Sequence, residues 1–332
     1  MISLFLFASF QAPTLTDQAS GTTALLQAVS PVSDRIAWAS GHRGTVVRTL
    51  DGGATWAAMV IPGADSMEFR DIHAFSADLA WAMSAGTGEA SRIYRTTDGG
   101  KHWTLQWTNQ EPRAFFDCIS FWDEKRGMAI SDAVDGVFVL MTTVDGETWQ
   151  RVPPEQSPKA REGEGLFAAS GTCLVTRGTD KAWFGAGVNA GRVGRTSDGG
   201  RTWTMANTPI LQNTASAGLT SLVMFDDLAG LGVGGDVAAP DSSRDRVVMT
   251  EDGGASWRLG GSLPFGGAAF GAAMAGGRTV VAVGPTGSAW TADGGKNWTP
   301  LDTNAYWSVG FAGNRGWMVG PRGRITMVEF LK

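Results

Sequence analysis

Short apolar runs of four or five residues, separated by polar turns, recur along this chain. Residues 71–75 (DIHAF) and 80–84 (AWAMS) are two such runs, joined by the turn SADL. Runs of this length that are bounded by turns predict paired antiparallel β-strands. Further pairs stand at 118–121 and 127–131, and at 221–225 and 230–234.

A short phrase follows such strand pairs and returns six times, reading Thr, any residue, Asp, Gly, usually Gly, two residues, Trp. Asp followed by Gly predicts a hairpin, because the carboxylate bonds backbone N–H groups of its own turn and glycine supplies the positive φ. The Trp is expected to begin the next strand and to pack between neighbouring sheets. We therefore assign structural roles to Asp51, Asp98, Asp145, Asp198, Asp252 and Asp293, and to Trp56, Trp103, Trp149, Trp203, Trp257 and Trp298.

The spacing of these phrases predicts the architecture. The Asp recurs after as few as 41 residues (252 to 293) and as many as 54 (198 to 252), and a four-stranded propeller blade takes about 40–50 residues. A seventh set of strands at 307–330 has no phrase and lacks a fourth strand, which residues 14–22 can supply. We expect an all-β, seven-bladed β-propeller over residues 13–332, closed into a ring by its N-terminal segment.

The composition of the chain bears on where the protein is located and on which class of partner it binds. The net charge is −5 and there is no basic tract, which argues against nucleic acid. Residues 1–12 are apolar but too short to span a bilayer, and they resemble a secretion signal that lacks its basic start. An ordinary N-terminus is the alternative, and we favour export to the periplasm or the outside.

The few cysteines and histidines predict neither a disulfide nor a metal site. Cys118 and Cys173 are placed on inner strands of adjacent blades, but their registers do not obviously match, so we expect two buried thiols. His42, His73 and His102 are the only histidines and fall in three different units. No cofactor or metal is expected.

The order of the strands indicates which face binds a partner. If a blade runs from strand A at the channel to strand D outside, the repeated phrase is the C–D turn, and the short A–B turns share its face. The opposite face then carries the long segments 84–91, 150–165, 205–218 and 236–246. Because binding residues concentrate on long loops over a rigid frame, we expect a functional site there.

Polar residues gather at the channel mouth on that face. Aligning the inner strands by their apolar anchors, such as Phe75 and Phe121, gives Asp71 and Asp117 the same rim position. A ring of carboxylates must pair internally, hold a cation or meet a basic partner, so we predict a polar binding funnel. The alternative is that Asp71 and Asp117 cap backbone groups between blades. The candidate binding residues are Arg70, Asp71, Asp117, Asp132, Glu164, Arg192, Asp236, Tyr306, Trp307 and Arg322, with Glu162 beside Glu164.

The repeated phrase resembles the Asp-box, or bacterial neuraminidase repeat. The runs at 37–56 (AWASGHRGTVVRTLDGGATW), 114–132 (AFFDCISFWDEKRGMAISD) and 164–173 (EGLFAASGTC) are similar to the bacterial branch of the photosystem II stability/assembly factor family. Members of its photosynthetic branch are non-catalytic propellers that hold a newly made reaction-centre subunit. The resemblance implies a monomer that binds a protein or peptide, with a membrane-protein client as the family's example.

A glycoside hydrolase is the alternative function. The chain resembles sialidases in its repeats but lacks their Arg-Ile-Pro motif, since FRD at 69–71 has no proline. A Tyr306 nucleophile with Arg70, Arg192 and Arg322 stays open, as does a carboxylate pair of Asp71 and Asp117. A strongly raised pKa on one of that pair is expected for a catalytic acid. We favour the non-catalytic binding function.

Overall fold

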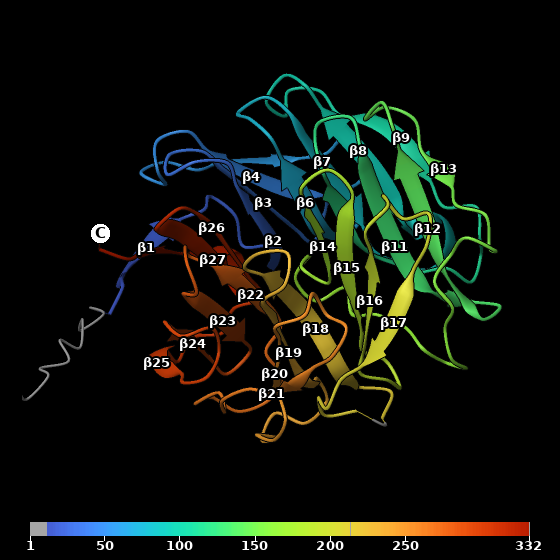
Figure 1. The fold of residues 1–332 in the computed structure, drawn as a ribbon. Helices are drawn as coiled ribbons and strands as arrows, with labels where there is room; N and C mark the ends of the chain where they lie inside the picture. Colours follow the sequence, from blue (N-terminus) through green and yellow to red (C-terminus); the bar gives the residue numbers. More distant parts are fainter. Residues whose placement is uncertain (1–11, 213, 332) are drawn as a thin grey trace, which may run out of the picture.

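The computed structural model describes residues 12–212 and 214–331, which form seven four-stranded antiparallel sheets around a central channel (Figure 1). The all-β, seven-bladed fold is therefore confirmed. Blades 1–3 are built from β2 (Leu26–Pro31), β3 (Ala37–Gly41), β4 (Thr45–Thr49) and β5 (Ala57–Val60); β6 (Phe69–Ala74), β7 (Ala80–Ser84), β8 (Arg92–Thr96) and β9 (Thr104–Thr108); β10 (Phe116–Phe121), β11 (Gly127–Val134), β12 (Val137–Thr143) and β13 (Gln150–Arg151).

The second half of the ring follows the same order of strands. Two 3₁₀ turns, η1 (Gly88–Ala90) and η2 (Pro321–Gly323), complete the regular structure of the described residues. Blades 4–7 are built from β14 (Leu174–Arg177), β15 (Lys181–Ala186), β16 (Arg192–Thr196) and β17 (Thr204–Asn207); β18 (Ala217–Met224), β19 (Gly230–Asp236), β20 (Val247–Thr250) and β21 (Arg258–Leu259); β22 (Gly271–Met274), β23 (Val280–Gly284), β24 (Gly287–Thr291) and β25 (Thr299–Asp302); β26 (Ser308–Ala312), β27 (Arg315–Val319), β28 (Arg324–Glu329) and β1 (Thr14–Ala19).

The N-terminal strand closes the ring. β1 pairs antiparallel with β28, so the two ends of the described chain lie side by side in blade 7 (Figure 1). Gln18 on β1 accepts a bond from the indole of Trp317 in blade 7 and from that of Trp56 in blade 1, each at 3.0 Å. The closing strand thus joins the last blade to the first. The expected secretion signal falls mostly on residues 1–11, which lie outside the described residues.

Each repeated phrase, called here the repeat turn, holds itself together. In the first copy, Thr49 Oγ1 donates to Asp51 Oδ1 at 2.9 Å, and that oxygen also accepts the N–H of Thr55 at 2.9 Å. Gly52 and Gly53 have φ of 77° and 86°, the left-handed region that this turn requires. The other five copies repeat the Thr–Asp bond at Asp98, Asp145, Asp198, Asp252 and Asp293. All six carboxylates are therefore engaged in their own turns.

Tryptophans on the second strand of a blade fasten it to the next blade. Trp38 Nε1 donates to the Ser76 carbonyl at 2.9 Å, and Trp183 Nε1 donates to the Gly253 carbonyl at 2.8 Å. The guanidinium of Arg48 lies 5.1 Å from the Trp38 ring and reaches the Ala77 carbonyl. Since Arg48 directly precedes a repeat turn and Ala77 lies in an A–B turn, both kinds of turn share one face, the repeat-turn face. The opposite side is the loop face.

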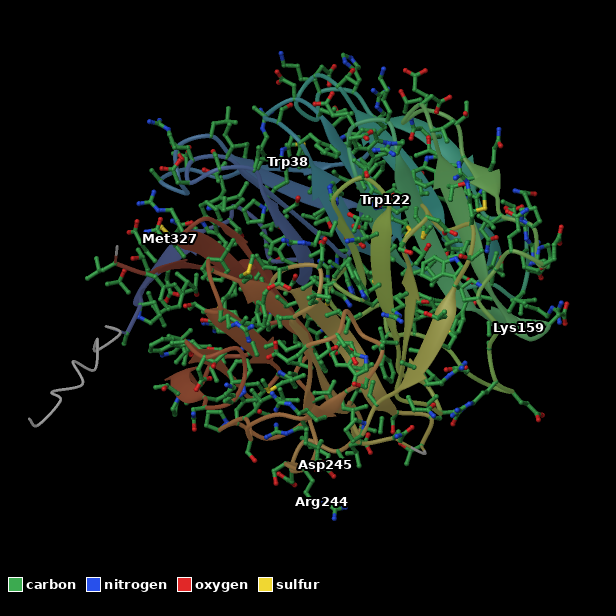
Figure 2. The ribbon with its side chains drawn as sticks, viewed as in Figure 1. Trp38, Trp122, Lys159, Arg244, Asp245 and Met327 are labelled. Atoms are coloured by element: carbon green, nitrogen blue, oxygen red, sulfur yellow. A yellow bond between two sulfur atoms is a disulfide. The ribbon has the colours of Figure 1, made fainter. Side chains whose placement is uncertain are left out.

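The long loops spread outward from the channel. Lys159, Arg244 and Asp245 lie on them at the outer edge of the molecule (Figure 2). No helix in the described part of the chain has the length and apolar character that crossing a membrane requires.

Candidate functional site

A bulge in the inner strands changes the predicted alignment of the channel mouth. One residue is skipped in the pairing of β6, between Phe69 and Asp71, and of β10, between Phe116 and Cys118. Asp71 therefore faces Met83 across the strand pair, and Cys118 faces Ile130. The A–B turns agree with this register, since they start at Phe75 in blade 2 and at Trp122 in blade 3, bonded to the carbonyls of Leu79 and Arg126.

Asp71 and Asp117 consequently do not share a rim position, and that prediction is wrong. Asp117 is equivalent to Arg70, whereas Asp71 is equivalent to Cys118. The sequence alignment failed because Phe75 and Phe121, its two anchors, are one position apart in the structure. Around the ring the level of Asp71, called here the ring position, holds Ala28, Asp71, Cys118, Cys173, Ser221, Gly271 and Ser308.

The two cysteines form a disulfide bond, contrary to the expected free thiols. Cys118 and Cys173 occupy the ring position of neighbouring blades, which brings their Cα atoms to 6.0 Å, within the range that a disulfide spans. Both side chains are fully buried. The sequence analysis did not allow for the bulge in β10, and for that reason it gave the two cysteines different registers.

Residues 166–172 (LFAASGT) cross the mouth of the channel and are called here the channel plug. Its backbone and small side chains bond to five blades, so the mouth is occupied by the protein's own chain. The plug bonds pair Leu166 N with Asp132 Oδ1 (2.7 Å), the Ala168 carbonyl with Gln27 Nε2 (3.2 Å), the Ser170 carbonyl with Ser308 Oγ (2.8 Å), Ser170 Oγ with the Phe270 carbonyl (2.8 Å) and Thr172 Oγ1 with Ser221 Oγ (2.7 Å).

Three predicted carboxyl groups lie beneath or beside this plug. Asp71 is 3% exposed, and its Oδ2 accepts the N–H of Ile119 in the next blade at 2.7 Å. Asp71 thus caps a backbone group between blades, the alternative role weighed for it. Asp117 is 1% exposed, and its Oδ2 has no partner among the described residues.

Burial governs the ionisation of all three groups. It raises the pKa of Asp71 and of Asp117 well above the usual range, and the charge of Asp132 raises the pKa of Asp117 further. Burial also raises the pKa of Asp132 to about 6. Burial therefore favours the uncharged form of Asp71 and of Asp117.

Glu164, in the long segment that enters blade 4, and Arg192, at the start of β16, form a buried ion pair. Arg192 Nε donates to Glu164 Oε1 at 2.7 Å, and its Nη2 reaches the other carboxylate oxygen and the Lys159 carbonyl. The N–H of Arg161 also donates to Glu164, at 2.7 Å. Asp236 accepts the N–H of Ala238 in its own turn at 2.9 Å. The pair holds the loop that leads into the plug.

Tyr306 does not reach the funnel, so its predicted place is wrong. It has no exposed surface and packs between blades 6 and 7 with Trp290 and Val309. Its hydroxyl bonds to Asp302 at 2.9 Å and to Thr326 at 3.0 Å, and burial raises its pKa to about 12. The constellation of a Tyr306 nucleophile with three arginines is not formed.

Arg70, Trp307 and Arg322 do reach the loop face. Arg70 bonds to Glu68 through Nε at 3.0 Å and lies over the Phe115 ring. Trp307 is half-buried and packs edge-on against Phe270, with ring centroids 5.1 Å apart. Arg322 is exposed, in the turn between β27 and β28.

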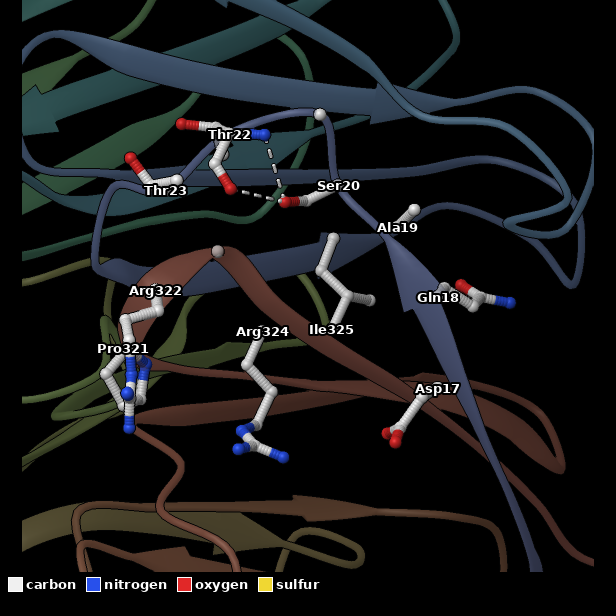
Figure 3. A pocket seen from close by; sticks show the side chains of 12 residues that line it. Asp17, Gln18, Ala19, Ser20, Thr22, Thr23, Pro321, Arg322, Arg324 and Ile325 are labelled. Carbon is white, nitrogen blue, oxygen red and sulfur yellow. Dashed lines mark hydrogen bonds between the residues drawn. The ribbon is translucent and has the colours of Figure 1, made fainter.

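A shallow hollow of about 740 Å³ lies beside Arg322, where the N-terminal segment closes the ring (Figure 3). Ser20, Thr22 and Thr23 lie on one side of it, and the guanidinium groups of Arg322 and Arg324 lie on the other. Neither arginine forms a salt bridge with any described residue. The hollow therefore offers hydroxyl groups and two guanidinium groups, with the carboxylate of Asp17 in the same lining.

The turn that carries Arg322 has a counterpart in blade 1. Gly41–His42–Arg43–Gly44 and Gly320–Pro321–Arg322–Gly323 connect the second and third strands of adjacent blades, and both arginines have φ of 58°. A non-glycine residue in this left-handed region costs roughly 1 kcal/mol. Neither the repetition of the turn nor Arg43 and Arg324 were singled out from the sequence, although the shared Gly-x-Arg-Gly pattern was visible there.

Within the described residues, no three His, Cys, Asp or Glu side chains are placed to hold a metal ion. No protein-family model matches the chain. No curated protein matches it by sequence either.

Solved structures do share the fold. A structure of YCF48 bound to a D1 peptide has a TM-score of 0.68 at 16% identity, over 98% of this chain and 96% of that one. YCF48 from Cyanidioschyzon merolae has a TM-score of 0.67 at 17% identity, over 96% and 99%. The GH74 enzyme of Niastella koreensis has a TM-score of 0.60 at 15% identity over 94% of this chain, which spans only 53% of that enzyme. At these identities the likeness establishes a propeller fold and does not establish the function, which has to be inferred from the site.

Proposed function

We propose that this propeller is a non-catalytic scaffold that binds a protein or peptide through its loop face. The observation that carries the proposal is the hollow at the ring closure, where the exposed Arg322 and the partly buried Arg324 present two guanidinium groups that form no salt bridge with a described residue. The strained backbone at Arg43 and Arg322, held in turns on a rigid frame, favours a role in recognition. The YCF48 structure with a bound D1 peptide supports a peptide as the ligand of such a fold.

The chemistry of this surface selects an acidic peptide that also carries an apolar side chain. Arginine guanidinium groups pair with carboxylates in bidentate geometry. Trp307, on the same blade and the same face as Arg322, adds an aromatic contact beside Phe270. Arg43, in the equivalent turn of the adjacent blade, extends the positive surface. The partner is therefore a segment with at least one Asp or Glu next to an apolar residue, bound by a monomeric propeller.

The resemblance to the bacterial branch of the photosystem II assembly factors is part of this proposal. The bonds inside the six repeat turns support their assignment as Asp-boxes. The disulfide supports export, because disulfides persist in oxidising compartments such as the periplasm. A membrane protein as the client is compatible with the proposed export and with the resemblance to the assembly factors.

Glycoside hydrolysis has less support from the geometry. Asp71 and Asp117 have the raised pKa that a catalytic acid needs, but burial under the plug is the cause. At 3% and 1% exposure, neither carboxyl can touch a substrate in the mouth. Tyr306 is equally inaccessible. Incubation with aryl glycosides, a sialoside included, is expected to give no turnover.

Binding is tested by fluorescence anisotropy with two labelled octapeptides, one containing alternating Glu and Leu and the other alternating Lys and Leu. The acidic peptide is expected to bind more tightly, with an affinity that falls as salt rises. Arg322→Glu should weaken it at least tenfold, and Trp307→Ala about threefold to tenfold. Arg244→Glu, at the outer edge of the molecule, is the matched control and should change little. Equal binding of both peptides, or an Arg322→Glu protein that binds like the wild type, would overturn the proposal.

A further inference from the structure

A second cavity lies inside the propeller, below the channel plug. It has a volume of about 360 Å³ and is lined by inner-strand residues of all seven blades. Ser170, Gly171 and Thr172 of the plug form its roof, and the lining extends to Pro31 and Phe121, where β2 and β10 end. The cavity is thus closed towards the loop face and reaches the repeat-turn face, the side opposite the proposed peptide site.

The lining has a polar arc on three consecutive blades. Ser30, His73 and Ser120 stand at the same level of their inner strands, opposite Trp38, Trp81 and Met128. At that level the blades across the channel carry only apolar side chains or none: Val175, Ala273 and Gly310. The cavity is therefore amphipathic, with hydrogen-bonding groups on one wall and carbon on the other.

The polar arc has unused hydrogen-bonding capacity. His73 makes no hydrogen bond to any described residue, and its ring lies between Phe75 and Phe121, with centroids 5.1 and 5.2 Å away. Ser30 Oγ accepts the N–H of Ala74 at 2.9 Å, which leaves its hydroxyl hydrogen to donate. A neutral imidazole adds one donor and one acceptor. The imidazole of His73 is partly exposed, so its ring nitrogens are free to bond to a ligand or to water.

Ser120 completes the arc as an acceptor. It lies 3.0 Å from Thr176 Oγ1, and Thr176 in turn donates to the Phe121 carbonyl at 2.7 Å. The hydrogen of Ser120 is therefore used within the protein, and its oxygen, which lines the cavity, can accept a further bond.

Burial disfavours the charged form of both titratable groups in the cavity lining. Burial lowers the pKa of His73 to about 4, so its imidazole is neutral at pH 7. Asp71 is the one carboxyl in the lining, and burial raises its pKa well above the usual range. An ion entering this site would lose its hydration in surroundings that disfavour charge.

We propose that the channel cavity binds a small uncharged polyhydroxylated molecule, of the size of a monosaccharide or cyclic polyol, that enters from the repeat-turn face. Its hydroxyl groups bond to Ser30, His73 and Ser120, and its C–H face packs on Val175 and Ala273. The volume fits this class, because water takes about 30 Å³ per molecule and the cavity holds roughly a dozen waters. The site is independent of the peptide surface.

Saturation-transfer NMR with D-glucose, myo-inositol and D-glucuronate tests the site. Glucuronate matches glucose in size and differs by its charge, so it serves as the matched probe. At least one neutral probe is expected to bind in the millimolar range, at least tenfold more tightly than glucuronate, and to shift the imidazole resonances of His73. Absence of binding by both neutral probes at 50 mM, or glucuronate binding as tightly, would overturn the proposal.

Two variants locate the binding. His73→Phe removes the imidazole and retains an aromatic ring between its neighbours, and Ala273→Leu fills the cavity from the apolar wall. Each is expected to weaken the neutral probe at least tenfold, with folding checked by circular dichroism. Ser120→Ala provides a smaller change, with a loss of about threefold to tenfold, if either variant fails to fold. Trp307→Ala, on the loop face, should leave the probe unaffected. Wild-type affinity in the folded cavity variants would contradict the site.

Discussion

Cys118 and Cys173 occupy the same position in the inner strands of blades 3 and 4, and their sulfur atoms are bonded. Cys173 directly follows the channel plug, and its N–H donates to Cys118 Sγ at 3.2 Å. The disulfide therefore fixes the end of the segment that crosses the mouth. Gln27, Asp132 and Ser308 hold the rest of that segment from three other points of the ring.

Removal of the disulfide should destabilise the propeller. The bond joins residues 55 positions apart, and a cross-link of that length is worth about 4 kcal/mol through the entropy of the unfolded chain. The Cys118→Ser/Cys173→Ser protein should lose about 2–4 kcal/mol of unfolding free energy in urea titration. The wild type in reductant is the control and should approach the same value. Free thiols in the unreduced, denatured wild type would contradict the bond.

Asp71 should be needed for stability and not for peptide binding. Asp71→Ala leaves the N–H of Ile119 buried without an acceptor, which costs about 1–3 kcal/mol. Asp71→Asn retains an oxygen that can accept this bond, so it should cost less than about 1 kcal/mol. Thermal or urea unfolding measures both. Loss of acidic-peptide binding in a folded Asp71→Asn protein would contradict the role of a cap and restore the polar funnel.

The repeated elements were predictable from the sequence because each copy carries its own local signal. Asp-Gly turns with a Trp at fixed spacing gave the blade count, and the missing fourth strand after residue 307 indicated that β1 closes the ring. These features rest on turn geometry and on strand propensity, which act over a few residues. The same local reasoning placed the long loops on one face.

The channel mouth was less predictable because it depends on departures from the repeat. The bulges at Arg70 and Asp117 shift the register by one residue without altering composition, so the equivalence of Cys118 with Cys173 was missed. The plug sequence LFAASGT has small residues and no periodicity, and only its tertiary bonds reveal it. Tyr306 lies just before the inner strand β26, yet its side chain packs between the blades, where Asp302 and Thr326 bond to its hydroxyl.

Asp132 should make stability depend on pH in the direction opposite to most carboxylates. Its folded pKa of about 6 lies above the usual value of 3.8, so the folded state binds its proton more tightly than the unfolded state. Stability from this group should therefore rise as pH falls from about 6 to about 4. Asp132→Asn removes the cost of the buried charge and should stabilise the protein at pH 8 by at most about 3 kcal/mol. The gain should vanish near pH 4.

Urea titrations of the wild type and of Asp132→Asn at pH 4, 6 and 8 measure this difference. Asp226→Asn is a control of opposite sign, because N–H bonds from Ala229 and Leu228 lower the pKa of Asp226. The Asp226→Asn protein should therefore be less stable than the wild type at pH 8. An Asp132→Asn protein that is equally or less stable than the wild type at pH 8 would refute the assignment.

Arg322→Gly, at the ring closure, should weaken peptide binding without lowering the stability of the protein. Arg322 holds φ at 58°, a conformation that glycine adopts without steric cost. Relief of this strain is partly offset by the greater freedom of glycine in the unfolded chain, so the unfolding free energy should stay unchanged or rise by up to about 1 kcal/mol. The affinity for the acidic octapeptide should fall at least tenfold with the loss of the guanidinium. Arg43→Gly, at the same position of the neighbouring turn, gives the matched comparison by urea titration and anisotropy. If Arg322→Gly lowered stability by more than 1 kcal/mol and left peptide affinity intact, the arginine would be a structural residue and the strained turn would have no part in recognition.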